Sequence, residues 1–252
     1  LNTATTEQMG YGSISFFVCS LMNQIVNHHL EKALKYYILG RDEFRNIQSM
    51  RRMKMKKNII AISREFGSGG RTIGKLVAEK LGIEFYDKDI IKKVAEESGL
   101  TRKYVEHYGE FAPSSDQRFA YSFVGLDEDS NSPLVQLWKT REKVITDFAT
   151  AKPCVIVGSC ADYILRDRED CLKVFLYADS DTKEKRIQEI YGEVGLKLKN
   201  RVKDMDIRRS LNYKYFTGQD WGKAQNYDMA LNRGSLGVEK CAQLIVEAAL
   251  GE

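Results

Sequence analysis

The chain has 252 residues, of which 43% are apolar and 29% charged, and it contains only three prolines. This composition excludes a largely disordered polypeptide and fits one large domain, or one domain with an appendage. The five cysteines are dispersed and form no CxxC pair. Neither a disulfide framework nor a zinc site is therefore expected, and a reduced, cytoplasmic setting is the simplest interpretation.

The net charge of +4 is concentrated at the N-terminus. Residues 1–57 contain nine Lys or Arg and four Asp or Glu, whereas residues 58–252 contain 30 basic and 31 acidic side chains. The basic character of the chain is thus a property of its first 57 residues. It gives no ground for expecting the rest of the chain to bind nucleic acid.

Residues 1–57 are predicted to form a helical, basic extension. Its most apolar stretch, residues 11–26, is too short to span a bilayer and has no features of a signal peptide, so no membrane contact is expected. Met53 and Met55 stand where the following domain would naturally begin, and one hypothesis treats the residues before them as an addition to the natural protein. The alternative is a helical arm that serves oligomerisation or a partner.

From residue 58 onward, short apolar runs alternate with segments of helical periodicity. We expect strands at 58–63, 84–86, 153–158, 172–178 and 228–232. We expect helices at 72–81, 89–98, 101–109, 134–149, 160–165, 182–191 and 237–249. Continuous apolar strands separated by helices predict an α/β domain of three layers, in which helices cover both faces of a parallel sheet.

Two parts of this domain, residues 58–252, interrupt the alternation. Residues 101–151 hold an irregular polar loop between two helices. Ligands of open α/β sheets bind beyond the carboxyl ends of the strands, so this segment is predicted to be a substrate-binding insertion. Residues 192–222, which overlap a polar turn expected at 191–200, are rich in basic side chains. They are predicted to form a lid, although a solvated helix pair would have a similar composition.

The strongest local pattern is the glycine-rich turn SREFGSGGRT at residues 63–72, between the first strand and the first helix. Backbone N–H groups of such a turn can converge on phosphate oxygens, and the helix that follows adds the positive end of its dipole. The predicted phosphate-binding residues are Gly67, Ser68, Gly69, Gly70, Arg71 and Thr72. The alternative is a tight turn that binds nothing.

This loop departs from the pattern G-x-x-x-x-G-K-[ST] in a specific way. A literal match over residues 69–75 starts too far from the strand, lacks the final hydroxyl and puts its lysine inside a helix. We therefore align residues 70–72 with G-K-[ST], so that Arg71 replaces the lysine and Glu65 replaces the first glycine. Arg71 would then neutralise phosphate charge, and Thr72 would be a magnesium ligand.

Further candidates stand at the predicted ends of other strands. Asp87 follows the second strand and would orient or deprotonate an acceptor or bind magnesium, or else cap the next helix. The segment GSCAD at 158–162 again brings backbone N–H groups to the sheet edge, and Asp162 would cap the helix or line the site. No histidine is placed to activate Cys160, which is expected to be a small buried side chain.

The lid region supplies the predicted catalytic arginines, Arg208 and Arg209. Arg186 and the basic side chains between 197 and 209 would help to cover transferring phosphates. The aromatic side chains expected to pack in the core or lid, rather than stack on a base, are Tyr213, Tyr215, Phe216 and Trp221.

From residue 58 onward the sequence resembles the cytidylate kinase-like family of P-loop nucleoside monophosphate kinases. The resemblance lies in IAISREFGSGGRTIGKLVAEKLG, FYDKDII, VIVGSCADYILRDR, and YKYFTGQDWG with YDMALN. The SREFGSGGR loop is similar to the family's own variant, and DIRR at 206–209 resembles the family's lid pattern. GSCAD resembles a GRCAD motif in which Ser159 replaces an arginine. In classical cytidylate kinases an arginine near this point serves the monophosphate, so the acceptor's identity stays open.

The resemblance implies a parallel sheet of about five strands, ATP with Mg²⁺ as the phosphoryl donor, and a cytidylate-type acceptor. Our main hypothesis is phosphoryl transfer from ATP to a nucleoside monophosphate, CMP or dCMP first. The residues expected to act in transfer are Arg71, Asp87, Arg208 and Arg209. Two alternatives are a kinase of another small molecule and a catalytically weak nucleotide-binding sensor or interaction module.

Overall fold

The computed structural model describes residues 55–109, 132–192 and 196–252. Most of the predicted N-terminal extension and the centre of the predicted 101–151 insertion lie outside the described residues, so both stay predictions. The same holds for the division of the chain at residue 58. The described segments belong to one compact unit, Arg51–Glu252.

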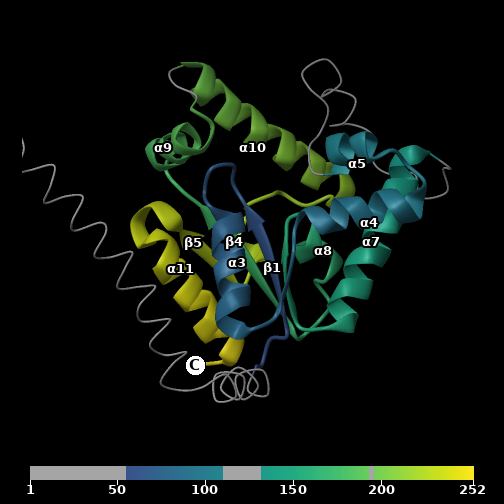
Figure 1. Ribbon diagram of the computed structural model, residues 1–252, viewed down its shortest axis with the longest axis horizontal. Helices are drawn as coiled ribbons and strands as arrows, with labels where there is room; N and C mark the ends of the chain where they lie inside the picture. Colours follow the sequence, from purple (N-terminus) through teal and green to yellow (C-terminus); the bar gives the residue numbers. More distant parts are fainter. Residues whose placement is uncertain (1–54, 110–131, 193–195) are drawn as a thin grey trace, which may run out of the picture. The chain divides into compact units, whose positions relative to one another are not determined.

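The described part of the chain contains a five-stranded parallel sheet. In spatial order its strands are β2 (Glu84–Tyr86), β3 (Cys154–Val157), β1 (Ile59–Arg64), β4 (Cys171–Tyr177) and β5 (Met229–Asn232). The predicted strands are confirmed, with each bound within one residue of the expected one. Since β1 lies between β3 and β4, the glycine-rich loop that follows it leaves the middle of the sheet (Figure 1).

The described helices agree with the predicted alternation. They are α3 (Gly70–Leu81), α4 (Lys88–Ser98), α5 (Arg102–Gly109), α7 (Pro133–Ala151), α8 (Ala161–Ile164), α9 (Ser180–Tyr191), α10 (Leu196–Thr217) and α11 (Arg233–Leu250), with a short 3-10 helix at Ala224–Asn226. α10 was not among the expected helices, and it begins inside the turn expected at 191–200. The expected start of α11 at residue 237 was wrong. α11 begins directly after β5 because the Asn232 side chain accepts hydrogen bonds from the N–H groups of Gly234 and Ser235, and the helix is interrupted at Gly237.

Helices cover both faces of the sheet, as its continuous apolar strands predicted (Figure 1). Within β1, Ile60 and Ile62 belong to the core beneath α3 and α11, whereas Ile59 and Ala61 belong to the core beneath α4, α5, α7 and α8. Successive side chains of a strand point to opposite faces, so one apolar run fills two cores. Burial of each isoleucine contributes roughly 1.5–3 kcal/mol, which makes the strand that leads into the loop a rigid support.

Candidate active site

The β1–α3 loop has the backbone geometry of an anion-binding turn. Gly67 and Gly69 have φ values of 84° and 86°, in the left-handed region that favours glycine. A Cβ on Gly67 would lie 3.1 Å from the Cβ and the carbonyl oxygen of Lys183, so the backbone of α9 also leaves little space there. Gly69 is the N-cap of α3 and has no side chain with which to cap it. The first N–H groups of α3 are therefore suited to an anionic ligand.

Two loop residues predicted to bind phosphate also shape the loop. Ser68 is fully buried, and its hydroxyl donates a hydrogen bond of 2.9 Å to the carbonyl oxygen of Glu65, which closes the turn. A Cβ on Gly70 would lie 2.6 Å from Cγ of Arg64. Glycine at position 70 thus makes room for the Arg64 side chain to cross the start of α3. The phosphate contacts expected of both residues stay predictions.

A network of charged side chains connects the glycine-rich loop to α9 and α10. The ammonium group of Lys183 on α9 lies 3.0 Å from Oε2 of Glu65 and 3.1 Å from Oδ2 of Asp206 on α10. The other oxygen of Asp206 accepts a 2.6 Å hydrogen bond from the N–H of Phe66. Burial lowers the pKa of Lys183, but the attraction of Asp206 and the hydrogen bonds to both carboxylates outweigh it, and the net pKa is raised. The network connects the glycine-rich loop to both α9 and α10.

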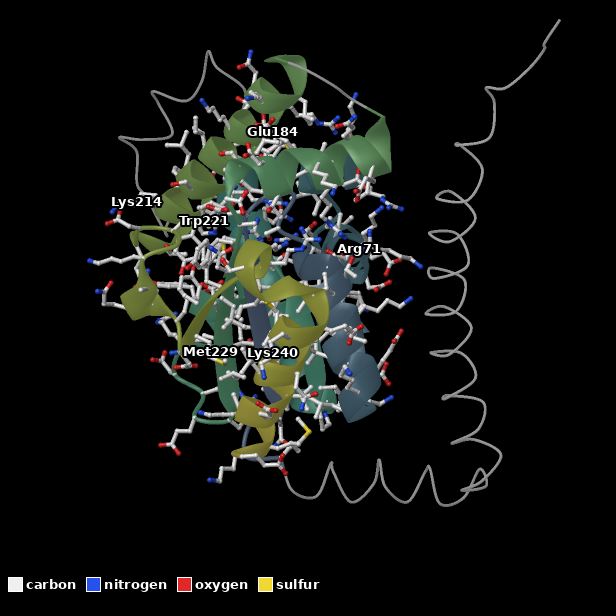
Figure 2. All side chains as sticks on the ribbon, turned by 90° about the vertical axis from the view of Figure 1, so that its left-hand side faces the viewer. Arg71, Glu184, Lys214, Trp221, Met229 and Lys240 are labelled. Atoms are coloured by element: carbon white, nitrogen blue, oxygen red, sulfur yellow. The ribbon has the colours of Figure 1, made fainter. Side chains whose placement is uncertain are left out.

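Arg71 and Asp87, predicted separately, lie together. Nε of Arg71, in the first turn of α3, is 2.9 Å from Oδ2 of Asp87 at the end of β2. Asp87 occupies the N-cap position of α4, as the capping alternative expected, but its side chain makes no capping hydrogen bond there. The Arg71 side chain, at the start of α3 (Figure 2), is 59% exposed and is accessible to an anionic ligand.

Two further arginines reach the start of α3 from the other side of the loop. Nη2 of Arg186 on α9 donates a 2.7 Å hydrogen bond to the hydroxyl of Thr72. A Cβ on Gly69 would lie 3.5 Å from Nε of Arg186 and 3.8 Å from Nε of Arg233 on α11. Burial, and then the neighbouring charge of Arg233, lower the pKa of Arg186. Two cations held this close favour an anion between them.

The residues present fit a magnesium ion only in part. The Thr72 hydroxyl stands in the first turn of α3, where its oxygen can serve as one ligand. That oxygen now accepts a hydrogen bond from Arg186, which must release it before a cation can bind. The described residues contain no group of three or more His, Cys, Asp or Glu side chains placed to hold a metal. A magnesium ion at Thr72 would thus rely on phosphate oxygens and water for its other ligands.

A pocket opens on the β3 side of the loop. Its lining combines the ends of β1 and β3, the end of α5, one side of α10 and the segment after it: Ser63, Arg64, Gly109, Gly158, Ser159, Cys160, Arg209, Asn212, Tyr213 and Trp221. Nη1 of Arg209 donates a 3.2 Å hydrogen bond to the carbonyl oxygen of Arg64. This bond connects α10 to the last residue of β1, directly before the loop. Two arginines, an amide and two aromatic rings suit a small, anionic ligand with a flat group.

The two predicted catalytic arginines of α10, Arg208 and Arg209, have different surroundings in the structure. Arg209 lines the pocket, whereas Nη1 of Arg208 lies 4.0 Å from Asp204 of the same helix. The catalytic role expected of Arg208 stays a prediction. Cys160 is buried, as expected. The four aromatic side chains expected to pack, Tyr213, Tyr215, Phe216 and Trp221, lie in one apolar cluster with Trp138, which confirms their packing. Tyr213 and Trp221 also line the pocket.

Asp162 accepts hydrogen bonds from two residues that line the pocket. Its carboxylate is buried and accepts hydrogen bonds from the hydroxyls of Ser63, at 2.8 Å, and Tyr213, at 2.7 Å. Burial raises the pKa of Asp162 despite these two hydrogen bonds, and burial together with the Asp162 charge raises the pKa of Tyr213. Asp162 therefore fixes two lining residues and does not itself face the pocket.

Comparison with known proteins assigns this chain to a family. A family model described as "Cytidylate kinase-like family" matches residues 59–235, which is more than half of the chain. The chain belongs to the cytidylate kinase-like family. The matched region begins with β1 and ends in the first turn of α11, so it includes the glycine-rich loop, the pocket and the residues of the charged network.

The sequence identity between this chain and the relatives described next is low. The chain is similar to a cytidylate kinase of Archaeoglobus fulgidus, at 24% identity over 190 residues that cover 75% of this chain and 93% of the relative. It is also similar to a cytidylate kinase of Methanobrevibacter smithii, at 26% over 189 residues, 75% and 96% of the two chains. A crystal structure of an uncharacterized protein from Eubacterium ventriosum has a TM-score of 0.59 and 26% identity, and covers 77% of this chain and 99% of that one.

Family and fold together support a phosphotransferase that acts on a nucleotide or another small molecule. Sequence reasoning singled out the loop, Asp87 and Arg209, which the structure brings close to one another, but it did not single out Lys183 or Arg233. Lys183 is 118 residues from Glu65 in the sequence, and no local pattern marks it. In the described part of the chain, no helix has the length and apolar character needed to cross a membrane.

Proposed function

We propose that this protein transfers the γ-phosphoryl group of ATP to a nucleoside monophosphate, with CMP or dCMP as the preferred acceptor. The observation that supports this most is the placement of two anion-binding regions on either side of one loop. Arg71, Arg186 and Arg233 surround the start of α3, and Arg64 and Arg209 line the adjoining pocket. A donor triphosphate and an acceptor phosphate need two such regions in contact.

On the donor side, backbone N–H groups of residues 67–71 bind the ATP phosphates, and the Arg71 guanidinium neutralises part of their charge. Thr72 would contribute a ligand to magnesium, which when bound shields the phosphate charges and orients the leaving group. For this, Arg186 turns from the Thr72 hydroxyl to the triphosphate. The positive Arg186–Arg233 pair makes that exchange favourable when an anion arrives.

On the acceptor side, an oxygen of the acceptor phosphate attacks the γ-phosphorus of ATP, and the bond from that phosphorus to the ADP oxygen breaks. Arg209, held against the root of the loop, stabilises the charge that develops between the two phosphates, and Arg208 assists from the same helix. Asp87, held by Arg71, orients the acceptor from the end of β2. The names of the two curated relatives favour a cytidine base.

A second candidate, a kinase of another small molecule, is favoured by one feature of the pocket. Ser159 lines the pocket at the position where the GRCAD motif, which GSCAD resembles, has an arginine. The serine side chain is uncharged. An acceptor without a phosphate group would need less positive charge there. A cytoplasmic location and oligomerisation through residues 1–57 stay predictions alongside this proposal.

The test is ADP production by the purified chain with ATP and magnesium, and with CMP, dCMP, UMP, AMP or GMP as the acceptor. R71A is the test variant and K75A the matched control, because exposed Lys75 lies one turn further along α3 and is the lysine of the rejected alignment. We expect turnover with CMP or dCMP, a loss of about tenfold or more in kcat/KM for ATP in R71A, and a change within about twofold in K75A. Absence of turnover with every acceptor would refute the proposed function.

A further inference from the structure

The start of α11 holds the side chain of Arg233 beside the glycine-rich loop. The Asn232 side chain caps this helix, and a Cβ on Gly234 would overlap the carboxylate of Asp179 at the start of α9. The starts of α9 and α11 are therefore packed closely together. Nε of Arg233 lies 3.8 Å from the point that a Cβ on Gly69 would occupy, so this packing places the guanidinium at the N-terminal end of α3.

Arg233 and Arg186 bring two positive charges to the same glycine. Nε of Arg186 lies 3.5 Å from the Cβ point of Gly69, and its only hydrogen bond within the described residues goes to the neutral hydroxyl of Thr72. Nε of Arg233 is buried and has no hydrogen-bond partner in the described part of the chain, where neither arginine forms an ion pair. Burial and the charge of Arg233 lower the pKa of Arg186, and the opposing attraction of Glu189 is smaller.

This arrangement of charge has a cost in the ligand-free protein. Two guanidinium groups that repel each other lower the stability of the fold. The first N–H groups of α3, which begins after Gly69, add the positive end of the helix dipole. A polyanion that lies over these groups relieves the repulsion and gains affinity from it. The loss of stability is thus exchanged for binding, a relation that is common at functional sites.

We propose that Arg233 is a further binding residue of the donor site, where it holds the phosphate chain of a nucleoside triphosphate together with Arg186. The inference rests on the proposed function for the identity of the donor, and on the position of Arg233 for the role. Because Arg233 lies against the glycine-rich loop, its contribution is to phosphate binding, and an inorganic polyphosphate should depend on it as ATP does.

The competing explanation is that Arg233 only packs between the helix starts. The two explanations predict opposite effects on the stability of the ligand-free protein. A packing residue stabilises the fold, so R233M would lower the urea midpoint. A residue held beside a second cation does not, because R233M keeps the length of the side chain and removes the repulsion. R233K keeps the charge and loses only the planar fork.

The experiment is a calorimetric titration of the full chain with ATP and, separately, with inorganic tripolyphosphate, without magnesium and in a buffer free of phosphate and sulfate. We expect R233M to lose about tenfold or more in affinity for both ligands, and R233K to lose less. K240M, which removes an exposed lysine from the same helix, should resemble the wild type (Lys240 is labelled in Figure 2). In urea, ligand-free R233M should have a midpoint equal to or above that of the wild type.

The inference is overturned by any one of four results. They are an ATP affinity of R233M within about twofold of the wild type, a loss confined to ATP, a loss in R233K as large as in R233M, and a lower urea midpoint for ligand-free R233M. If R233M does not fold, R233Q takes its place with the same expectations. Binding of both ligands that depends on Arg233, without turnover of any acceptor, would refute the proposed function and leave the role of Arg233 standing.

Discussion

Replacing Lys183 by methionine tests whether the charged network supports the phosphate loop. Lys183 is 9% exposed, and its ammonium lies within 3.1 Å of both Glu65 and Asp206. K183M keeps most of the side-chain volume but leaves two neighbouring carboxylates without their shared cation. Breaking a buried ion pair by removing one partner costs roughly 3–5 kcal/mol, and the partial exposure of Glu65 places this site at about 3 kcal/mol.

The magnitude can be measured by urea and by thermal unfolding. A loss of about 3 kcal/mol lowers the Tm of a domain of this size by about 6–12 °C. Because Asp206 also holds the N–H of Phe66, the loop should loosen and the KM for ATP should rise.

A matched control joins the same two helices. Lys199 of α10 lies 3.8 Å from Glu184 of α9, but its side chain is 56% exposed, so K199M should cost less than about 1 kcal/mol (Glu184 is labelled in Figure 2). If K183M is no more destabilised than K199M, and its KM for ATP is unchanged, the network does not support the loop.

Three further predictions follow from single residues. G67A and G192A both place alanine at a positive φ, but only Gly67 also meets neighbouring atoms, so G67A should be destabilised by about 1 kcal/mol more in urea unfolding; equal losses would contradict this. The raised pKa of Asp162 means that its stabilising contribution is complete below its ordinary value of 3.8 and is lost as pH rises through the raised value. Relative to D162N, which cannot titrate there, the wild-type free energy of unfolding should therefore fall as the pH rises above the ordinary value of 3.8; a flat or rising difference would refute the raised pKa. Burial raises the pKa of Cys154 and of Cys171 to about 12, so peptide mapping after iodoacetamide treatment should find both unmodified in the folded chain and modified in urea, and rapid alkylation of either in the native state would contradict their burial.

The strands β1 and β3 could be predicted because most of their residues are apolar. Both strands are buried on both faces, so their sequences are continuous apolar runs without alternating polar residues. The turn residues around them indicate where each strand begins and ends. Gly82 and Gly99 ended α3 and α4 where expected, since both adopt the left-handed conformation that closes a helix. The start of α11 could not be predicted in the same way, because its cap is an asparagine that also ends a strand.

The site was predictable only where it is local in sequence. The strand, the loop and the first turn of α3 are contiguous, so their residue types alone indicate a phosphate-binding turn. The ion pair between Arg71 and Asp87 depends on which strands are neighbours. The contact of Arg186 with Thr72 depends on how α9 crosses the sheet edge.

The sequence by itself determined the alternation of strands and helices, the position of the glycine-rich loop between the first strand and the first helix of the domain, and the separation of charge between residues 1–57 and the rest, because each follows from neighbouring residues. Only the tertiary structure decided which charges meet. Lys183 joins Glu65 across 118 positions, and Arg141 reaches Cys160 through an aromatic cluster built from two helices. Such contacts arise from the packing of elements far apart in the chain, and no periodicity in the sequence records them.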